Sequence, residues 1–160
     1  AVDSRFDWAA VIAVAHAAPA ERIDIFGPER IGRPMLPSNV TVHGPIPYVD
    51  LPVLLATYRV GLMPFNDHAL NHGRSPMKYY EYLSAGLFVL GKSTPELERR
   101  RFSGSILYHQ HDDIPDAAAA IKTLQSPNND GRAVAQEMNW RSRAMTLLEF
   151  ASHLKADKSW

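Results

Sequence analysis

The sequence of 160 residues predicts one α/β domain with three layers and a mostly parallel sheet. Helical and strand patterns alternate along the chain, which is the order expected of a parallel sheet with helices on both faces. The run Leu87-Phe88-Val89-Leu90 is continuously apolar, as in a strand buried on both faces. Hydrophobic residues make up 46% of the chain and charged residues 21%, so the composition is that of a globular domain.

The first half of the chain contains two helical patterns and three strand patterns. Apolar residues at i, i+3, i+4 and i+7 predict a first helix, through Trp8, Val11, Ile12 and Ala15. Short alternating or apolar runs predict strands over 23–26, 40–42 and 60–63. Asp50 is a suitable cap for a second helix, whose apolar stripe is Leu51, Leu54, Leu55 and Tyr58.

The second half continues the alternation. Ser75-Pro76 predicts a helix start and Gly86 the position just past its end. Strands follow over 87–90 and 106–108, and Ser93 with Glu96 has the spacing of a capping box. Helices are expected over 113–125, over 131–138 and from Trp140 onward, the last with an apolar stripe of Trp140, Ala144, Leu147, Leu148, Ala151 and Leu154. Ligands of such sheets bind at the carboxyl ends of the strands, here loops 27–38, 43–50, 64–75, 91–94 and 109–113.

Composition excludes several classes of function. Lys+Arg and Asp+Glu number 17 each, so the chain lacks the basic excess of a nucleic-acid-binding protein. It has no cysteine, which rules out disulfides, thiolate metal sites and cysteine nucleophiles, and fits a cytoplasmic location. No apolar run approaches the roughly 20 residues of a membrane span, and the N-terminus lacks the pattern of a signal peptide.

The stretch Arg74 to Gly86 carries the most chemical information. A helix that begins at the carboxyl end of a strand presents free N–H groups and its positive dipole end to the ligand crevice. Arg74, Ser75 and Lys78 add two cations and a hydroxyl there, which suits a phosphate or diphosphate. Glu81, one turn deeper, suits the two hydroxyls of a ribose. A Lys and a Glu at this spacing are also common as a solvated surface pair, so spacing alone leaves both interpretations open.

The sequence of this stretch resembles the donor-binding helix of GT-B-fold glycosyltransferases of the bacterial group 1 type. Related members often read Pro-Leu-Lys-x-x-Glu-Tyr-Leu-Ala-x-Gly before an apolar strand, and here the chain reads Ser-Pro-Met-Lys-Tyr-Tyr-Glu-Tyr-Leu-Ser-Ala-Gly from Ser75. The resemblance extends to Arg5–Trp8, Ile25–Pro28, Asn39–Tyr48 and Tyr58–Phe65, and together these segments cover about residues 3 to 92.

The resemblance implies a Rossmann-like domain that forms the C-terminal half of a GT-B fold and binds a nucleotide-diphosphate sugar of the UDP or GDP type, without a further cofactor or metal. By resemblance Glu81 binds the ribose and Lys78 the diphosphate, helped by Ser75 and by Arg5 as a second cation. Gly44 and Ile46 flank the base. Asn71 and Arg74 face the diphosphate or sugar.

The same resemblance sets expectations for the whole protein. Residues 1–160 form a single donor-binding domain, and Ala1-Val2 is at most a stub of the family's central first strand. The partner is the N-terminal acceptor domain, which contributes any catalytic base, so the isolated chain is expected to be inactive in transfer to a glycan or lipid-linked acceptor. Many retaining members carry a second Glu where this chain has Gly73, which leaves the stereochemistry open.

Other interpretations remain at this stage. A nucleotide-sugar epimerase shares the fold, and a non-catalytic Rossmann-like interaction domain would bind no nucleotide. The histidines at 109 and 111, or at 68 and 72, are weak metal-ligand patterns in polar loops. The run Arg99-Arg100-Arg101 is most simply a solvated helix end, with peripheral contact at the inner face of the membrane as the alternative.

Overall fold

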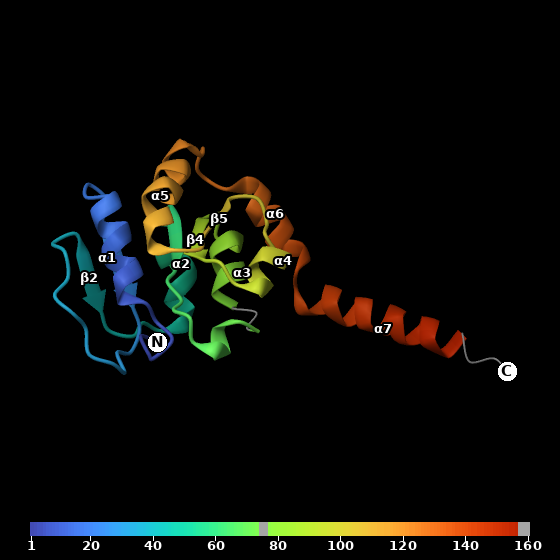
Figure 1. Cartoon of the computed structure of the whole chain (residues 1–160). Helices are drawn as coiled ribbons and strands as arrows, with labels where there is room; N and C mark the ends of the chain where they lie inside the picture. The colour runs from blue at the N-terminus through green and yellow to red at the C-terminus, as the bar shows by residue number, and fades with distance from the viewer. Residues whose placement is uncertain (74–76, 157–160) are drawn as a thin grey trace.

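The computed structural model describes residues 1–73 and 77–156. The described helices and strands alternate as expected (Figure 1). In chain order they are α1 (Trp8–Ala17), β1 (Ile23–Phe26), β2 (Val40–His43), η1 (Tyr48–Asp50), α2 (Leu51–Leu55), β3 (Val60–Met63), η2 (Ala69–Asn71), α3 (Met77–Ser84), β4 (Phe88–Lys92), α4 (Pro95–Arg99), β5 (Ser105–Tyr108), η3 (His111–Asp113), α5 (Ile114–Thr123), α6 (Asn129–Glu137) and α7 (Trp140–Ala156).

All the strand pairs are parallel, which confirms the predicted fold class. The strands form two sheets, however: β1 pairs with β2, and β3-β4-β5 form the other sheet. The alternating residues of β1 and β2 point to opposite faces, with Ile23, Ile25, Val40 and Val42 on the side of α1. The structure is therefore a Rossmann-like α/β domain whose sheet is interrupted between β1 and β3.

The segment from Val2 to Asp7 links the two sheets at the carboxyl ends of their strands. On the side of β1, the N–H of Val2 donates to the carbonyl of Pro28 at 3.0 Å, and Val2 makes a parallel bridge to Glu29. On the side of β3, the N–H of Asp7 donates to the carbonyl of Pro64 at 2.9 Å. This segment therefore lies between the ends of β1 and β3 and brings their loops together.

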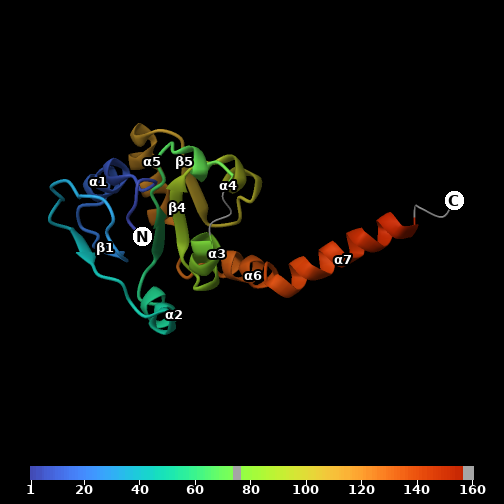
Figure 2. The same cartoon turned by 90° about the horizontal axis from the view of Figure 1, so that it is seen from below.

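Two layers of helices cover the sheets (Figures 1 and 2). Helices α1 and α5 pack against each other over one face, in a core that includes Trp8, Val11, Leu90 and Ile114. Helices α3 and α6 pack over the other face, in a core that includes Met63, Leu83, Val89 and Leu97. The three-layer arrangement predicted from the sequence is present in the described residues.

The end of α3 follows from its glycine. Gly86 has a φ of +81°, a conformation that residues with a Cβ rarely adopt. The N–H of Gly86 donates to the carbonyl of Leu83 at 2.8 Å, and that of Leu87 donates to the carbonyl of Tyr82 at 3.0 Å. This pair of bonds is a Schellman motif, so the predicted helix end is confirmed. The predicted start at Ser75-Pro76 lies outside the described residues.

Three local predictions were wrong. The cap of α4 is Thr94, whose Oγ1 accepts from the N–H of Leu97 at 3.2 Å, whereas the Ser93 hydroxyl donates to Glu98. Asp50 makes no side-chain capping bond because the turn before α2 is already helical, and α2 ends at Leu55, before Tyr58.

The final helix forms, but Ala144, Leu147 and Leu148 of its apolar stripe are exposed. Helix α7 projects away from the rest of the domain (Figures 1 and 2), and Leu147 and Leu148 are 69% and 64% exposed. The apolar pattern of a helix predicts which side chains share a face, but burial of that face requires another element to pack on it.

Arg59 secures the end of α5, and its loss is expected to lower the free energy of unfolding by about 1–2 kcal/mol. Its guanidinium donates to the carbonyls of Ile121 at 3.0 Å and of Leu124, and lies 5.7 Å from the ring centre of Phe88. Chemical denaturation of Arg59→Ala measures the change. The matched control, Arg33→Ala, removes a half-exposed arginine 3.8 Å from Glu29 and should stay within about 0.5 kcal/mol of the parent. Equal effects in both variants would contradict a capping role.

Candidate functional site

Helix α3 is held by its inner face, which directs Lys78 and Glu81 outward. Tyr79 and Leu83 are 1% and 0% exposed. The Tyr79 hydroxyl donates to the carbonyl of Arg100 at 2.9 Å and lies 2.8 Å from the Ser105 hydroxyl. On the outer side Lys78 is exposed and Glu81 half-buried. The predicted Arg74 and Ser75 lie outside the described residues.

Glu81 lies in a pocket between α2 and α3. The pocket has a volume of about 410 Å³ and a mostly apolar wall, and its lining includes Tyr48, Leu51, Pro52, Leu55, Glu81 and Arg132. The Tyr48 hydroxyl donates to Glu81 Oε1 at 3.4 Å. Burial and then the negative charge of Glu81 raise the pKa of Tyr82 to about 12. An apolar wall beside one carboxylate suits a ligand with a flat apolar part and hydroxyl groups.

The charges of Lys78, Arg30 and Arg5 all act on the amino group of Ala1, which lies at the carboxyl ends of β1 and β3. The pKa of the Ala1 ammonium is lowered, first by burial and then by the charges of Lys78 and, more weakly, of Arg30 and Arg5, while Asp3 opposes the shift. Three cations from three segments distant in sequence therefore lie within electrostatic range of Ala1. This point is at the edge of the sheets where ligands of parallel α/β domains bind.

Arg5 has a carboxylate partner in the structure. Its Nε and Nη2 lie 3.1 and 2.5 Å from Oδ1 and Oδ2 of Asp3. The hydrogen bonds from Arg5 hold the pKa of Asp3 well below its usual range, although burial acts the other way. An anionic ligand would therefore have to share Arg5 with Asp3 or take its place.

Asn71 supports the backbone that carries Arg5. It is 1% exposed, and its Nδ2 donates to the carbonyls of Arg5 at 3.2 Å and Asn66 at 2.9 Å. The N–H of Asn66 also donates to the carbonyl of Arg5, at 3.1 Å. Oδ1 of Asn71 is buried and has no hydrogen-bond partner in the part of the chain that the structure describes.

Gly44 and Ile46 lie in the loop between β2 and η1. The carbonyl of Gly44 accepts from the N–H of Gly27 at 3.2 Å, which joins the loops that follow β1 and β2. Gly44 is exposed, with open space where a side chain would stand, and Ile46 is half-buried. The loop continues to Tyr48, which contacts Glu81. The structure thus brings this loop next to the pocket through Tyr48, while the charges of Lys78 and Arg5 act on Ala1.

Sequence reasoning missed Tyr48, Arg30 and Asp3 as neighbours of the site. Tyr48 and Arg30 lie in loops that were expected to face ligands, 43–50 and 27–38. Nothing in the periodicity of a loop distinguishes one polar side chain from the next. Their contacts depend on how separate loops meet at the sheet edge.

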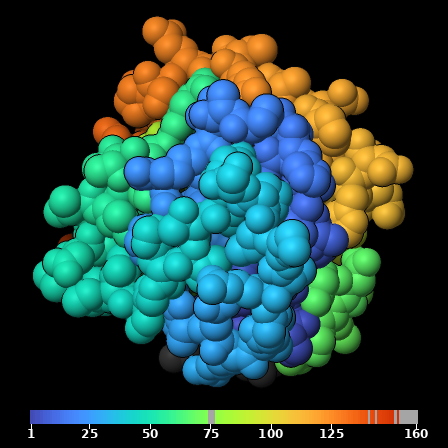
Figure 3. Space-filling view, turned by 90° about the vertical axis from the view of Figure 1, so that its left-hand side faces the viewer, coloured from blue at the N-terminus to red at the C-terminus, as the bar shows by residue number. Residues whose placement is uncertain are grey.

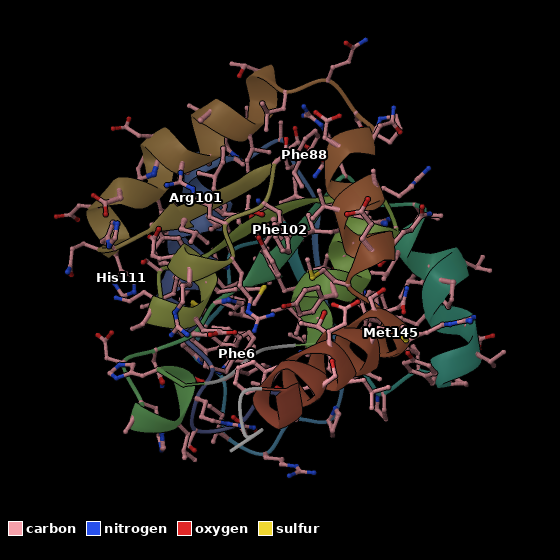
Figure 4. All side chains as sticks on the ribbon, turned by 90° about the vertical axis from the view of Figure 1, so that its right-hand side faces the viewer. Phe6, Phe88, Arg101, Phe102, His111 and Met145 are labelled. Atoms are coloured by element: carbon pink, nitrogen blue, oxygen red, sulfur yellow. The ribbon has the colours of Figure 1, made fainter. Side chains whose placement is uncertain are left out.

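The weaker metal patterns have other partners. His111, labelled in Figure 4, places Nε2 2.8 Å from Asp7 Oδ2, and His109 Nε2 lies 3.7 Å from Glu98. His68 Nδ1 accepts from the N–H of Leu70 at 3.2 Å. Within residues 1–73 and 77–156, no group of three or more His, Asp or Glu side chains is arranged to hold a metal ion.

The arginine run is partly neutralised. Arg99 lies 3.4 Å and Arg100 2.5 Å from the Glu96 carboxylate, while Arg101 is exposed. Among the described helices, none combines the length and apolar composition needed to cross a bilayer. A second cavity, of about 490 Å³, lies at the amino ends of β4 and β5, away from all the candidate residues.

Comparison with known proteins decides the family. A family model described as glycosyl transferase-like matches residues 8–153. The chain belongs to this glycosyl transferase-like family. Its relatives include the "Putative teichuronic acid biosynthesis glycosyltransferase TuaH" of Bacillus subtilis (strain 168), which is 24% identical over 118 residues.

That match covers 70% of this chain and 30% of the relative, so the chain spans less than a third of the relative's length. No solved structure matches the chain significantly. Family membership supports a general glycosyltransferase role, and it agrees with the parallel, Rossmann-like sheets.

Proposed function

We propose that this member of the family binds the nucleotide part of a nucleotide-diphosphate sugar, the donor in glycosyl transfer. The observation that carries the proposal is the arrangement along α3. Glu81 lies in a largely apolar pocket, and Lys78, one turn earlier, acts electrostatically on Ala1 together with Arg5 and Arg30. A carboxylate in an apolar pocket suits a nucleoside, and a group of cations beside it suits a diphosphate.

The chemistry required of such a site is electrostatic. Negative charge builds on the leaving diphosphate as the glycosidic bond breaks, and fixed cations stabilise that charge. Lys78 and Arg5 would serve this purpose, together with the first amides of the helix that carries Lys78. The Glu81 carboxylate would accept hydrogen bonds from the two ribose hydroxyls, which fixes the nucleotide relative to the cations.

We also propose that residues 1–160 act as one donor-binding domain within a larger enzyme. In the described chain β1 pairs only with β2, and β3 only with β4, so each has one unpaired edge. A further parallel strand between them would satisfy both edges. The acceptor and any catalytic base would come from another domain. The name of the relative supports a polysaccharide as the product.

Titration calorimetry with UDP, GDP, ADP and TDP tests the donor proposal. We expect the chain to bind one of these nucleotides best, and Glu81→Ala to weaken that binding about 10- to 100-fold. The reason is that hydrogen bonds to a charged group contribute about 1.5–3 kcal/mol. Glu21→Ala is the matched control, because Glu21 is exposed and lies before β1, at the opposite edge of the sheet.

Two results would contradict the proposal. A folded chain that binds none of the four nucleotides at millimolar concentration would favour a non-catalytic interaction domain. Nucleotide binding that Glu81→Ala and Glu21→Ala leave equally unchanged would place the nucleotide elsewhere on the molecule.

A further inference from the structure

His43 ends β2 on the same side of the sheets as α3. Residues Ile23, Ile25, Val40 and Val42 face the α1 core, so the intervening Asp24 and His43 face the opposite side. Tyr58, which follows α2, reaches Asp24 on that side, and α3 covers the same side of the second sheet. Figure 3 views the molecule from this end, with the blue and cyan chain of α1 to β2 in front and α2 beside it.

The imidazole of His43 is held in one orientation by two neighbours. Its Nε2 lies 2.7 Å from Asp24 Oδ1. The Phe26 ring stacks on it, with centres 4.5 Å apart and planes within 10°. The register of the strands explains this contact, because Phe26 and His43 are directly paired across β1 and β2.

Several neighbouring side chains donate hydrogen bonds to Asp24 and hold its carboxylate in place. Its side chain is 4% exposed and also accepts from the Tyr58 hydroxyl at 2.8 Å and from Arg22 Nε at 2.6 Å. Burial acts to raise the pKa of Asp24, but the bonds from His43, Tyr58 and Arg22 lower it overall. The carboxylate is therefore ionised near neutral pH and accepts a hydrogen bond from Nε2 of His43.

The anchored ring remains partly open to solvent. The His43 side chain is 40% exposed even though Asp24 and Phe26 occupy one edge and one face. The next residue is Gly44, which leaves open space beside the strand end, and the loop then runs to Tyr48 at the Glu81 pocket. An aromatic ring with fixed orientation and an uncovered part therefore stands at the start of the loop that reaches the candidate ribose-binding carboxylate.

We propose that the His43 ring is the stacking platform for the nucleobase of the donor, held in place by Asp24 and Phe26. This inference rests on the proposed donor-binding function and assigns the base a position in it. A base with its ribose on Glu81 would extend over the 43–48 loop toward His43. Stacking on an aromatic face is open to every base, so the platform supplies affinity and leaves selection among bases to the loop backbone.

Tyr48 is the other exposed ring in this loop, and it is a poorer platform. It is 75% exposed, and its hydroxyl makes a 3.4 Å bond to Glu81. Ordering an exposed side chain on binding reduces affinity, whereas His43 is already held by Asp24 and Phe26. Tyr48 is therefore assigned to the positioning of Glu81.

The test compares His43→Ala and His43→Phe with the parent chain, using UDP and GDP as probes. We expect His43→Ala to weaken the better-bound nucleotide about tenfold, and His43→Phe to stay within about threefold of the parent because it keeps a ring on Phe26. His16→Ala is the control, since His16 is exposed in the last turn of α1, on the other side of the sheet. NMR spectra of the nucleotide add a second readout: base protons should shift upfield on binding to the parent and to His43→Phe, but not to His43→Ala.

Each alternative outcome is decisive. Unchanged affinity in His43→Ala, with Glu81→Ala still weakened, would overturn the platform and leave the donor site intact. An equal loss in His43→Ala and His43→Phe, with both variants folded, would assign the effect to the bond with Asp24 and overturn the platform. Absence of the upfield shift in the parent complex would overturn it without any variant. A folded parent that binds neither UDP nor GDP would overturn the platform and count against the donor function as well.

Discussion

Replacing Asn128 by alanine is expected to lower the free energy of unfolding by about 2–4 kcal/mol. Asn128 is 4% exposed. Its Oδ1 accepts from the N–H of Gly131 at 2.9 Å and caps α6, and its Nδ2 donates to the carbonyls of Leu87 at 3.2 Å and Ser103 at 3.1 Å. One amide thus joins α6 to the segments that enter β4 and β5, and its loss leaves the carbonyl of the buried Leu87 without this donor.

The neighbourhood of Asn128 explains why substitutes would not fit. A Cβ on Gly104 or Gly131 would stand 2.2 or 2.3 Å from its Nδ2, so both glycines leave room for the amide. Asn128→Asp keeps the capping oxygen but loses both donors, and should be destabilised as strongly as the alanine variant. Asn129→Ala, the exposed neighbour, is the control and should change stability by less than about 0.5 kcal/mol. Urea denaturation of the three variants measures these differences, and a shift below about 1 kcal/mol for Asn128→Ala would contradict this role.

The sequence allowed the order and type of most elements to be predicted, because each depends on local patterns. The stripe of α1 has the period of a helix, and the apolar run before Gly91 is short enough to favour a buried strand. The end of α3 could be placed at Gly86 since the motif needs a residue with positive φ there. At Ser93-Thr94 two adjacent hydroxyl residues were both suitable caps, and the choice of Thr94 depends on the direction in which the chain leaves β4.

Contacts between distant segments could not be predicted from such local patterns. The link that Val2 to Asp7 makes between the two sheets depends on the loops after β1 and β3 meeting at one point. For the candidate site, the spacing of Lys78 and Glu81 on one helix suits a phosphate and a ribose but also a solvated surface pair, and the resemblance of the stretch from Ser75 to Gly86 favoured the first interpretation. The contact of Tyr48 with Glu81 and the stacking of Phe26 on His43 both join separate elements. Neither can be deduced from one segment alone.

Reversing the charge of Lys78 is expected to have the largest effect on ligand binding. We expect Lys78→Glu to weaken UDP or GDP binding at least about 100-fold, because it removes a hydrogen-bonded cation worth about 1.5–3 kcal/mol and adds repulsion. The loss of affinity should be largest for the nucleoside diphosphate and smaller for the monophosphate. The nucleoside should bind as it does to the parent, since Glu81 and the pocket remain. Calorimetric titration of the three ligands into the parent and the variant measures this gradient.

Lys122→Glu is the matched control, because it changes the net charge equally but lies at the end of α5, at the opposite edge of the sheet. If affinity fell equally in both variants, the protein's overall charge would be responsible and Lys78 would have no specific role. If Lys78→Glu weakened nucleoside binding as much as diphosphate binding, the substitution would have disturbed the whole helix. If only Lys78→Glu showed this gradient, the orientation of the donor along α3 would be fixed, with the diphosphate at Lys78 and the nucleoside at Glu81.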